Sequence, residues 1–226
     1  MNDPRQEIDL GFTQEIFPDC HHVCLIYDNE GQRRKIVSEY LAAGIKRGDL
    51  VRYFADTTAP EEVRAWLLEK GIELDKAEQQ GHFAIVKAEN AYCPSGQFVP
   101  PQVIENMLSR YAMAKQAGYH GSRACGEMTW ALHGIPGSDR LLEYEIRINT
   151  ITETFPYVGM CQYNARLFDG ATLFKVLQVH PYMIAQGQIV RNPYYHKPEE
   201  FLSKFPENAR SIQLRPVRIS LRNPDR

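Results

Sequence analysis

Residues 22–56 read HVCLIY, DNEGQRR, KIVSEYLAAGIKRG and DLVRYFAD, and this stretch decides the fold. The apolar residues 22–27 predict a strand, and residues 50–55 predict a second one. Between them, from about Gly31 to Arg47, the apolar side chains fall at helical spacing. A strand, a helix and a strand in this order form the βαβ unit that opens nucleotide-binding α/β domains.

The loop after the first of these strands lacks the residues that hold phosphate. A P-loop has the pattern G-x-x-x-x-G-K-[ST], in which glycines allow close approach of the backbone and the lysine contacts the phosphates. Residues 28–33 read DNEGQR, with one glycine, two acids and no Gly-Lys pair. Asp28, Asn29 and Glu30 would repel a triphosphate, so the sequence predicts the scaffold of a nucleotide binder without its phosphate site.

The composition is that of a soluble globular domain. The chain has 226 residues, 43% hydrophobic and 24% charged, with a formal net charge of −2. The lack of dense Lys/Arg tracts argues against direct nucleic-acid binding. No apolar run approaches the roughly 20 residues of a membrane span, and the polar N-terminus does not resemble a signal peptide. We therefore expect a cytoplasmic protein, with no membrane partner, whose five cysteines stay reduced.

Further strands and helices alternate along the chain. Helices are predicted at about 60–70, 101–116, 141–155 and 169–179, and strands at 82–86, 122–128 and 158–163, with a closing strand or hairpin at 180–190. Leu74 is assigned to a short turn, residues 88–100 to a loop, and residues 1–20 to an irregular leader. The tail from Pro198 is assigned to a docking extension or a disordered segment. This alternation predicts a mostly parallel sheet with helices on both faces.

Ligands of such sheets usually bind at the carboxyl ends of the strands. Tyr27 ends the first strand, and Glu127 and Trp130 stand where the strand at 122–128 ends. In a RecA-like fold, an acid at this place holds Mg²⁺ or activates water. Without a phosphate loop, Glu127 is expected to orient a small ligand or to pair with Arg123.

Histidine and cysteine patterns elsewhere are weaker signals. Cys20, His22 and Cys24 have the spacing that places side chains on one face of a strand, but no second pair completes a tetrahedral metal site, so a core histidine is favoured. Cys161 and His180 have the residue types of a nucleophile and its base. A free cysteine in an apolar strand is, however, commonly a small buried hydrophobe. We therefore expect neither a metal ion nor a cofactor.

Two acids and a set of aromatic residues complete the candidates. Glu143 and Glu145 lie two residues apart on a predicted helix and point in different directions, so they are not a catalytic pair. One is expected to be a buried partner of an arginine and the other to lie at the surface. Tyr163 belongs to an aromatic set that lines either an apolar pocket with polar tips or the core. The set comprises Tyr27, Tyr53, Tyr92, Trp130, Tyr163, Tyr194 and Tyr195.

Several short segments occur together in an informative order. They are HVCLIY at 22–27, AGIKRG at 43–48, GEMTW at 126–130, EYE at 143–145, CQY at 161–163, HP at 180–181 and NPYY at 192–195. In this order and spacing, they resemble the MEDS domain, the sensory domain of methanogen and methylotroph regulators. The resemblance covers about residues 20–197 and divides the chain into a leader (1–20), a MEDS-like sensory domain (21–197) and a C-terminal extension (198–226).

The resemblance implies a three-layer RecA-like fold, similar to P-loop NTPases and circadian-clock-type ATPases, with a degenerate P-loop. It also implies a role in sensing small hydrocarbon derivatives. Related domains are attached to, or work beside, DNA-binding domains, histidine kinases and anti-sigma-type regulators. This chain has no room for such an output domain, so we expect output through a regulatory protein partner. A homodimer is compatible with this interpretation.

The leading hypothesis is a non-enzymatic small-molecule sensory module in prokaryotic signal transduction or transcriptional regulation. Its expected ligand contacts are His22, Tyr27, Glu127, Trp130, Cys161, Tyr163 and His180. One alternative is an enzyme, either a residual nucleotide hydrolase or a Cys/His thiol enzyme. A second alternative is a protein-interaction domain without a ligand.

Overall fold

A seven-stranded sheet forms the centre of the molecule. The computed structural model describes residues 7–14, 16–18, 21–152 and 155–204. The strand order is β5-β4-β6-β7-β3-β8-β9, and every neighbouring pair is parallel except β8 and β9. The bounds are β3 His21–Tyr27, β4 Leu50–Ala55, β5 Phe83–Lys87, β6 Ser122–Glu127, β7 Tyr157–Asn164, β8 Tyr182–Ala185 and β9 Gln188–Arg191. The predicted mostly parallel α/β sheet is therefore confirmed.

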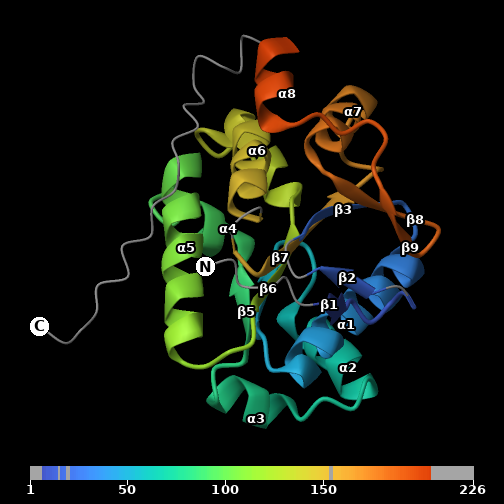
Figure 1. Cartoon of the computed structure of the whole chain (residues 1–226), viewed down its shortest axis with the longest axis vertical. Coiled ribbons are helices and arrows are strands. Elements are labelled where there is room, and N and C mark those ends of the chain that lie inside the picture. The colour runs from blue at the N-terminus through green and yellow to red at the C-terminus, as the bar shows by residue number, and fades with distance from the viewer. Residues whose placement is uncertain (1–6, 15, 19–20, 153–154, 205–226) are drawn as a thin grey trace, which may run out of the picture.

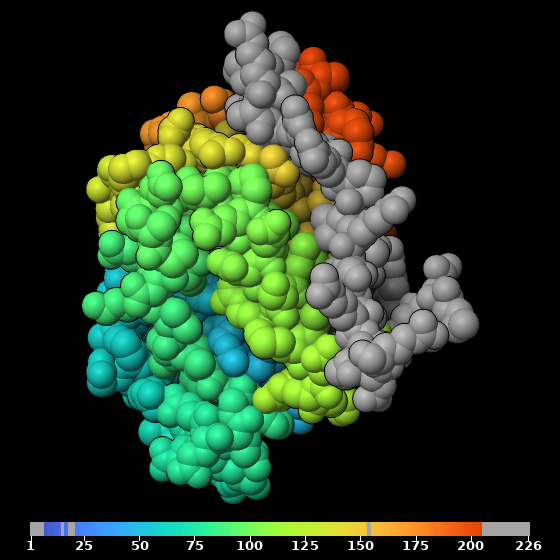
Figure 2. Space-filling view, turned by 90° about the vertical axis from the view of Figure 1, so that its left-hand side faces the viewer, coloured from blue at the N-terminus to red at the C-terminus, as the bar shows by residue number. Residues whose placement is uncertain are grey.

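Helices cover both faces of this sheet (Figure 1). On one face lie α1 (Glu30–Arg47), α2 (Pro60–Glu69) and α3 (Leu74–Gln79), whose apolar residues share one core cluster. On the other face lie α4 (Ala88–Tyr92), α5 (Pro100–Gln116), α6 (Leu141–Thr152) and α7 (Gly170–Val179), which share a second cluster. Figure 2 shows α5 with α6 above it and α3 below it on one side of the molecule.

The connection from β3 to α1 is only two residues long. Asn29 caps the helix, because its side-chain oxygen accepts a hydrogen bond from the backbone N–H of Gln32 at 2.9 Å. At the other end, Gly48 adopts a left-handed conformation (φ +86°) that ends the helix before β4. The connection therefore holds no glycine-rich phosphate loop, as the sequence predicts.

Alternation along the strands assigns each side chain to one face. In β3, Val23, Leu25 and Tyr27 pack in the α1 and α2 core, whereas Cys24 and Ile26 pack in the α5, α6 and α7 core. This period of two is what a parallel strand buried on both faces requires. The face on which a side chain lies decides which of the candidate residues can contact one another.

Several segments predicted as irregular are ordered elements. The turn at Leu74 is helix α3, because Leu74 and Ala77 are both buried at helical spacing, and residues 88–92 of the predicted loop form helix α4. In the predicted irregular leader, β1 (Glu7–Asp9) and β2 (Ile16–Pro18) form an antiparallel pair, and Ile8 enters the core. The tail begins with α8 (Pro198–Lys204), which buries Phe201. The rest of the tail, residues 205–226, lies outside the described residues.

Candidate functional site

The seven predicted ligand residues lie in three separate places. Tyr27 and Glu127 belong to a polar network on the α1 and α2 face. Trp130 lies in an aromatic group beyond the end of β6. His22, Cys161, Tyr163 and His180 meet on the opposite face, beneath α6 and α7. A single pocket made from all seven is therefore absent from the part of the chain that the structure describes.

Arg33 is the centre of the network at the carboxyl ends of the strands. Its side chain is 3% exposed, and its guanidinium carbon lies 5.1 Å from the centre of the Tyr27 ring. It donates hydrogen bonds to Gln162 Oε1 on β7 (2.9 Å) and to Thr58 Oγ1 beyond β4 (2.8 Å). Its Nη1 also lies 3.8 Å from Glu127 Oε1. An arginine from the first turn of α1 thus occupies the region where related folds bind ligands.

Glu127 is fully satisfied within this network. Its Oε1 accepts a hydrogen bond from the Tyr53 hydroxyl at 2.6 Å, and its Oε2 accepts from the Thr57 backbone and hydroxyl at 2.6 and 2.7 Å. Burial opposes the charge, but the hydrogen bonds from Thr58, Tyr53 and Thr57 bring the pKa of Glu127 below its ordinary value. The carboxylate is therefore charged at neutral pH. Glu127 does not pair with Arg123, which instead contacts Asp49 at 3.2 Å.

Trp130 stands in a turn of 3₁₀ helix, residues Thr129–Leu132, directly after β6. Its indole stacks on Tyr92 with ring centroids 4.9 Å apart. Gly126 makes this packing possible, because a Cβ atom there would lie 2.2 Å from the Tyr92 hydroxyl oxygen. The indole N–H of Trp130 and the hydroxyl of Thr129 are buried and have no hydrogen-bond partner among the described residues.

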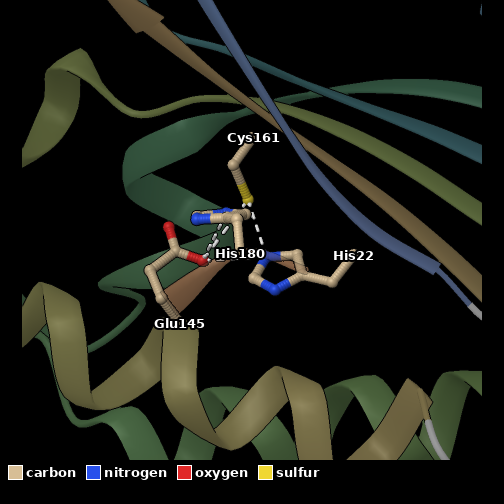
Figure 3. A group of neighbouring side chains, drawn as sticks. All are labelled: His22, Glu145, Cys161 and His180. Carbon is tan, nitrogen blue, oxygen red and sulfur yellow. Dashed lines mark hydrogen bonds and ion pairs between the residues drawn. The ribbon is translucent and has the colours of Figure 1, made fainter. Parts of the chain in front are cut away.

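Four side chains from four segments form a compact buried cluster, which we call the HECH cluster: His22, Glu145, Cys161 and His180 (Figure 3). His22 comes from β3, Glu145 from α6, Cys161 from β7, and His180 from the residue that follows α7. One ligand atom of each lies within 4.8 Å of the others. Each of the four is at most 4% exposed.

Neighbouring groups orient the HECH cluster. His22 Nδ1 lies 2.9 Å from Asn149 Oδ1, and His180 Nδ1 lies 2.8 Å from the Val176 carbonyl oxygen. The Tyr163 hydroxyl donates to Glu145 Oε1, while Glu145 Oε2 lies 3.0 Å from His22 Nε2. Fixing the outer atom of each ring and of the carboxylate directs the remaining atoms toward the centre of the cluster.

Burial sets the protonation states in the HECH cluster. It lowers the pKa of His180 to about 3, with His22 adding to the effect, so His180 is neutral at pH 7. It raises the pKa of the Cys161 thiol well above the ordinary value, and Glu145 raises it further. Burial also opposes the charge of Glu145, but His180, His22 and Tyr163 bring the pKa of this carboxyl below its ordinary value. A buried thiol of raised pKa is a poor nucleophile.

Glu145 and Asn149 are the residues that the sequence did not reveal. Glu143 is the expected buried partner of arginines, since it contacts Arg140 and Arg147 at 2.8 and 2.7 Å. The expectation that the other of the two acids lies at the surface is wrong, because the side chain of Glu145 is fully buried. Helix α6 contacts the sheet on one side and α5, α7 and α8 on the others. The helical period alone therefore does not show which positions of α6 face the solvent.

Two imidazoles, a thiol and a carboxylate are ligand types that bind transition metals. The HECH cluster therefore has the chemistry to hold a metal ion. The donors of Arg33 are engaged by Glu30, Thr58 and Gln162, and residues 28–33 contain no lysine for nucleotide phosphates. Within the described residues, no helix is both long and apolar enough to cross a membrane.

Solved structures with this arrangement of elements are KaiC-like and RecA-like proteins. A KaiC-like protein of Pyrococcus horikoshii superposes with a TM-score of 0.55 and 15% identity over 80% of each chain. The flagellar accessory protein FlaH of Methanocaldococcus jannaschii gives a TM-score of 0.55 and 12% identity, covering 82% of this chain and 84% of FlaH. These similarities establish the RecA-like fold.

Two comparisons at the level of sequence, with a relative and with a family profile, identify the family of the chain. The transcriptional repressor DcmR of Methylorubrum extorquens is 26% identical over 162 residues, which are 70% of this chain and 57% of DcmR. The chain thus matches little more than half of its relative. Residues 21–181, most of the chain, match the profile of the MEthanogen/methylotroph, DcmR Sensory domain. On this match, and with a RecA-like sheet that lacks a phosphate loop, the chain belongs to the MEDS family.

Proposed function

We propose that this chain is a non-enzymatic sensory module that binds a small hydrocarbon derivative at the carboxyl ends of β4 and β6. The observation that carries the proposal is that three buried polar atoms, at the ends of two neighbouring strands, have no hydrogen bond to a described residue. Asp56 Oδ2 follows β4, and Thr129 Oγ1 and Trp130 Nε1 follow β6, its neighbour in the sheet. None of the three makes a hydrogen bond to a described residue, although Asp56 Oδ2 lies 3.4 Å from His133 Nε2.

Unsatisfied buried groups of this kind suit a ligand that carries one polar group. Burying a polar atom without a partner costs about 1–3 kcal/mol, and a bound polar molecule removes that cost. Trp130 donates only, Asp56 accepts only, and Thr129 does both. A short alcohol fits this set, because its hydroxyl both donates and accepts while its carbon chain meets the aromatic rings of Tyr92 and Trp130.

Signalling through a protein partner completes the proposal. The family is a sensory one, and DcmR is a transcriptional repressor. A ligand that binds one conformation better than another shifts the population of the two. The proposed output is a change at a surface that a regulatory protein contacts, with no direct contact to nucleic acid. The cytoplasmic location and the division into leader, domain and extension stay predictions.

Enzymatic alternatives receive little support from the same geometry. At the strand ends the donors of Arg33 are already engaged by Gln162 and Thr58, and residues 28–33 contain no Gly-Lys pair for phosphates. Cys161, the candidate nucleophile, is buried with a raised pKa. A nucleotide hydrolase predicts turnover of ATP, and a thiol enzyme predicts rapid alkylation of Cys161 by iodoacetamide at neutral pH. We expect neither.

Tryptophan fluorescence tests the proposal directly. The chain has two tryptophans, so Trp66→Phe leaves Trp130 as the reporter and Trp130→Phe leaves Trp66. Short alcohols, aldehydes, amines and halogenated alkanes form the panel, with thermal shift as a second readout. We expect a saturable fluorescence change in Trp66→Phe that is absent in Trp130→Phe.

A matched pair of threonine variants locates the site. Thr129→Val removes the unpaired hydroxyl and should lower the affinity for the binding compound about tenfold. Thr152→Val removes a hydroxyl of similar burial that bonds within α6 and should leave the affinity unchanged. If no compound on the panel changes the fluorescence or the melting temperature, the proposed ligand class is wrong. Equal effects of the two valine variants would place the site elsewhere.

A further inference from the structure

The HECH cluster lies on the opposite face of the sheet from the Arg33 network, and its chemistry is independent of the proposed sensing role. We propose that it is a buried site for one divalent transition-metal ion of the zinc type. The ligands are His22 Nε2, Glu145 Oε2, Cys161 Sγ and His180 Nε2. Figure 3 shows the four side chains converging from their separate elements.

The spacing of the ligand atoms is already close to that of a tetrahedral site. Bonds of about 2.0–2.3 Å in tetrahedral arrangement place neighbouring ligand atoms about 3.3–3.7 Å apart. Glu145 Oε2 lies 3.0 Å from His22 Nε2, 3.5 Å from Cys161 Sγ and 3.5 Å from His180 Nε2. Cys161 Sγ lies 3.4 Å from His22 Nε2. Small side-chain movements would therefore bring all four atoms to bonding distance of one ion.

Groups around the cluster fix both imidazoles in the tautomer that a metal needs. The Val176 carbonyl oxygen only accepts, so the ring proton of His180 lies on Nδ1. Asn149 Nδ2 donates to the Val179 carbonyl at 2.7 Å, which leaves its Oδ1 to accept the proton on His22 Nδ1. In the neutral form of each ring, which is the form that binds a metal ion, Nε2 then carries a lone pair that faces the cluster centre. Metal-binding histidines show this outer hydrogen bond almost always.

Without an ion, one acceptor of the cluster has no donor. The Val176 carbonyl holds the ring proton of His180 on Nδ1, so the Nε2 lone pair faces the carboxylate of Glu145 at 3.5 Å. Accordingly, His180 Nε2 is buried and has no hydrogen bond to any described residue. A cation at the centre would satisfy all four atoms at once. Binding would release the thiol proton to solvent.

Charge balance and ligand type select the ion. A thiolate and a carboxylate together neutralise a divalent cation, which suits a site closed off from water. Imidazole and thiolate ligands favour zinc and similar ions, whereas magnesium and calcium prefer oxygen ligands. Four protein ligands leave no open position, which is the arrangement of structural rather than catalytic sites. The ion would join β3, β7, α6 and the residue that follows α7.

Metal analysis of the purified full chain tests the proposal. We expect about one zinc ion per chain to survive dialysis, because closed structural sites bind tightly. Replacing zinc with Co²⁺ should give the strong visible bands of a tetrahedral ion and a thiolate charge-transfer band. Absence of stoichiometric metal, or only the weak bands of an octahedral cobalt ion, would overturn it. These readings need no ligand, so they are independent of the sensing test.

Variants identify the ligands while circular dichroism checks that each one folds. Cys161→Ala should lose the charge-transfer band and stoichiometric binding. Cys24→Ala is the matched control, because Cys24 is a fully buried thiol opposite Cys161 in the β3–β7 register and lies outside the HECH cluster. Tyr163→Phe, which frees Glu145 Oε1, should weaken binding about 10–100-fold. Loss of the metal in Cys24→Ala, or its retention in Cys161→Ala, would refute the assigned ligand set.

Discussion

Arg33 is the residue on which the polar network at the carboxyl ends of the strands is centred. Its guanidinium lies between the rings of Tyr27 and Trp66, 5.1 and 5.3 Å from their centres. The positive charge is balanced by Glu30 at the surface and by Glu127 in the interior. The charge of this arginine is thus balanced within the domain itself. Removing one of these charged side chains should therefore destabilise the domain, because its partner stays buried without a counter-charge.

Glu127→Gln should destabilise the domain by about 3 kcal/mol at neutral pH, because it leaves the buried Arg33 without its interior counter-charge. Urea denaturation of the two proteins measures the difference. Glu78→Gln is the control, since Glu78 pairs with Arg64 near the surface and should change stability by less than about 1 kcal/mol. A loss as small in Glu127→Gln as in the control would contradict this account.

The same variant predicts a pH dependence. The hydrogen bonds from Tyr53, Thr57 and Thr58 lower the pKa of Glu127 in the folded protein, and Arg33 faces the same carboxylate. Its stabilising contribution is then complete above the unfolded-state pKa and is lost as the pH falls through the folded-state pKa. The stability gap between wild type and Glu127→Gln should therefore be constant near pH 7 and narrow below about pH 4.5. Urea denaturation across this range measures the gap. A gap that widens as the pH falls would mean that folding raises the pKa of Glu127, which would contradict the prediction.

At the scale of elements, α1 carries two glycines with opposite roles. Gly31 lies in the first turn, where an added Cβ would meet only Asn29 Oδ1 at 3.4 Å. Gly44 lies near the end, where a Cβ would come within 2.6 Å of Arg123 Cδ. Arg123 cannot move aside easily, because it is fully buried and bonded to Asp49 and the Tyr40 carbonyl. The second glycine is therefore a packing requirement.

Alanine at the two positions should change stability in opposite directions. Gly31→Ala should stabilise by about 0.5 kcal/mol through helix propensity. Gly44→Ala gains the same propensity but overpacks Arg123, so we expect a net loss of about 2 kcal/mol. Thermal and urea denaturation of both variants provide the comparison. Stabilisation by both substitutions would mean that Arg123 repacks at no cost.

Strand alternation explains which site predictions the sequence could support. His22 and Tyr27 are five residues apart on β3, so they face opposite sides of the sheet and cannot line one pocket. Cys161 and Tyr163 are two apart and do share a face, where both contact Glu145. The two-residue spacing of Cys161 and Tyr163 could be seen in the sequence. The burial of Glu145 could not, because it depends on which helices surround α6.

At the scale of the whole molecule, the core extends beyond the family match. The match ends at residue 181, yet α8 buries Phe201 against Ile146 and Val179. Phe201→Ala should cost about 3 kcal/mol, as for other large buried side chains. Leu202→Ala, at a partly buried neighbour in the same cluster, is the control and should cost less. Equal costs in urea denaturation would show that α8 packs only loosely.

The overall architecture was predictable, whereas the order of strands was not. Helix and strand periods placed most elements within a few residues, since each period reflects local burial. The position of β3 between β7 and β8 depends on pairings over long sequence distances, which no local pattern encodes. The HECH cluster depends on the same pairings, because β7 and the segment between α7 and β8 bring Cys161 and His180 to His22.

The central place of β3 also bears on how the chain folds during its synthesis. Its neighbours β7 and β8 begin roughly 130 and 155 residues after β3 ends. A ribosome adding residues at about 5–20 per second needs on the order of 10 s to supply them. Throughout that interval, an apolar segment meant for the middle of the sheet has no partner on either side. Folding of this domain must wait for its C-terminal half, and the nascent chain would benefit from a chaperone until then.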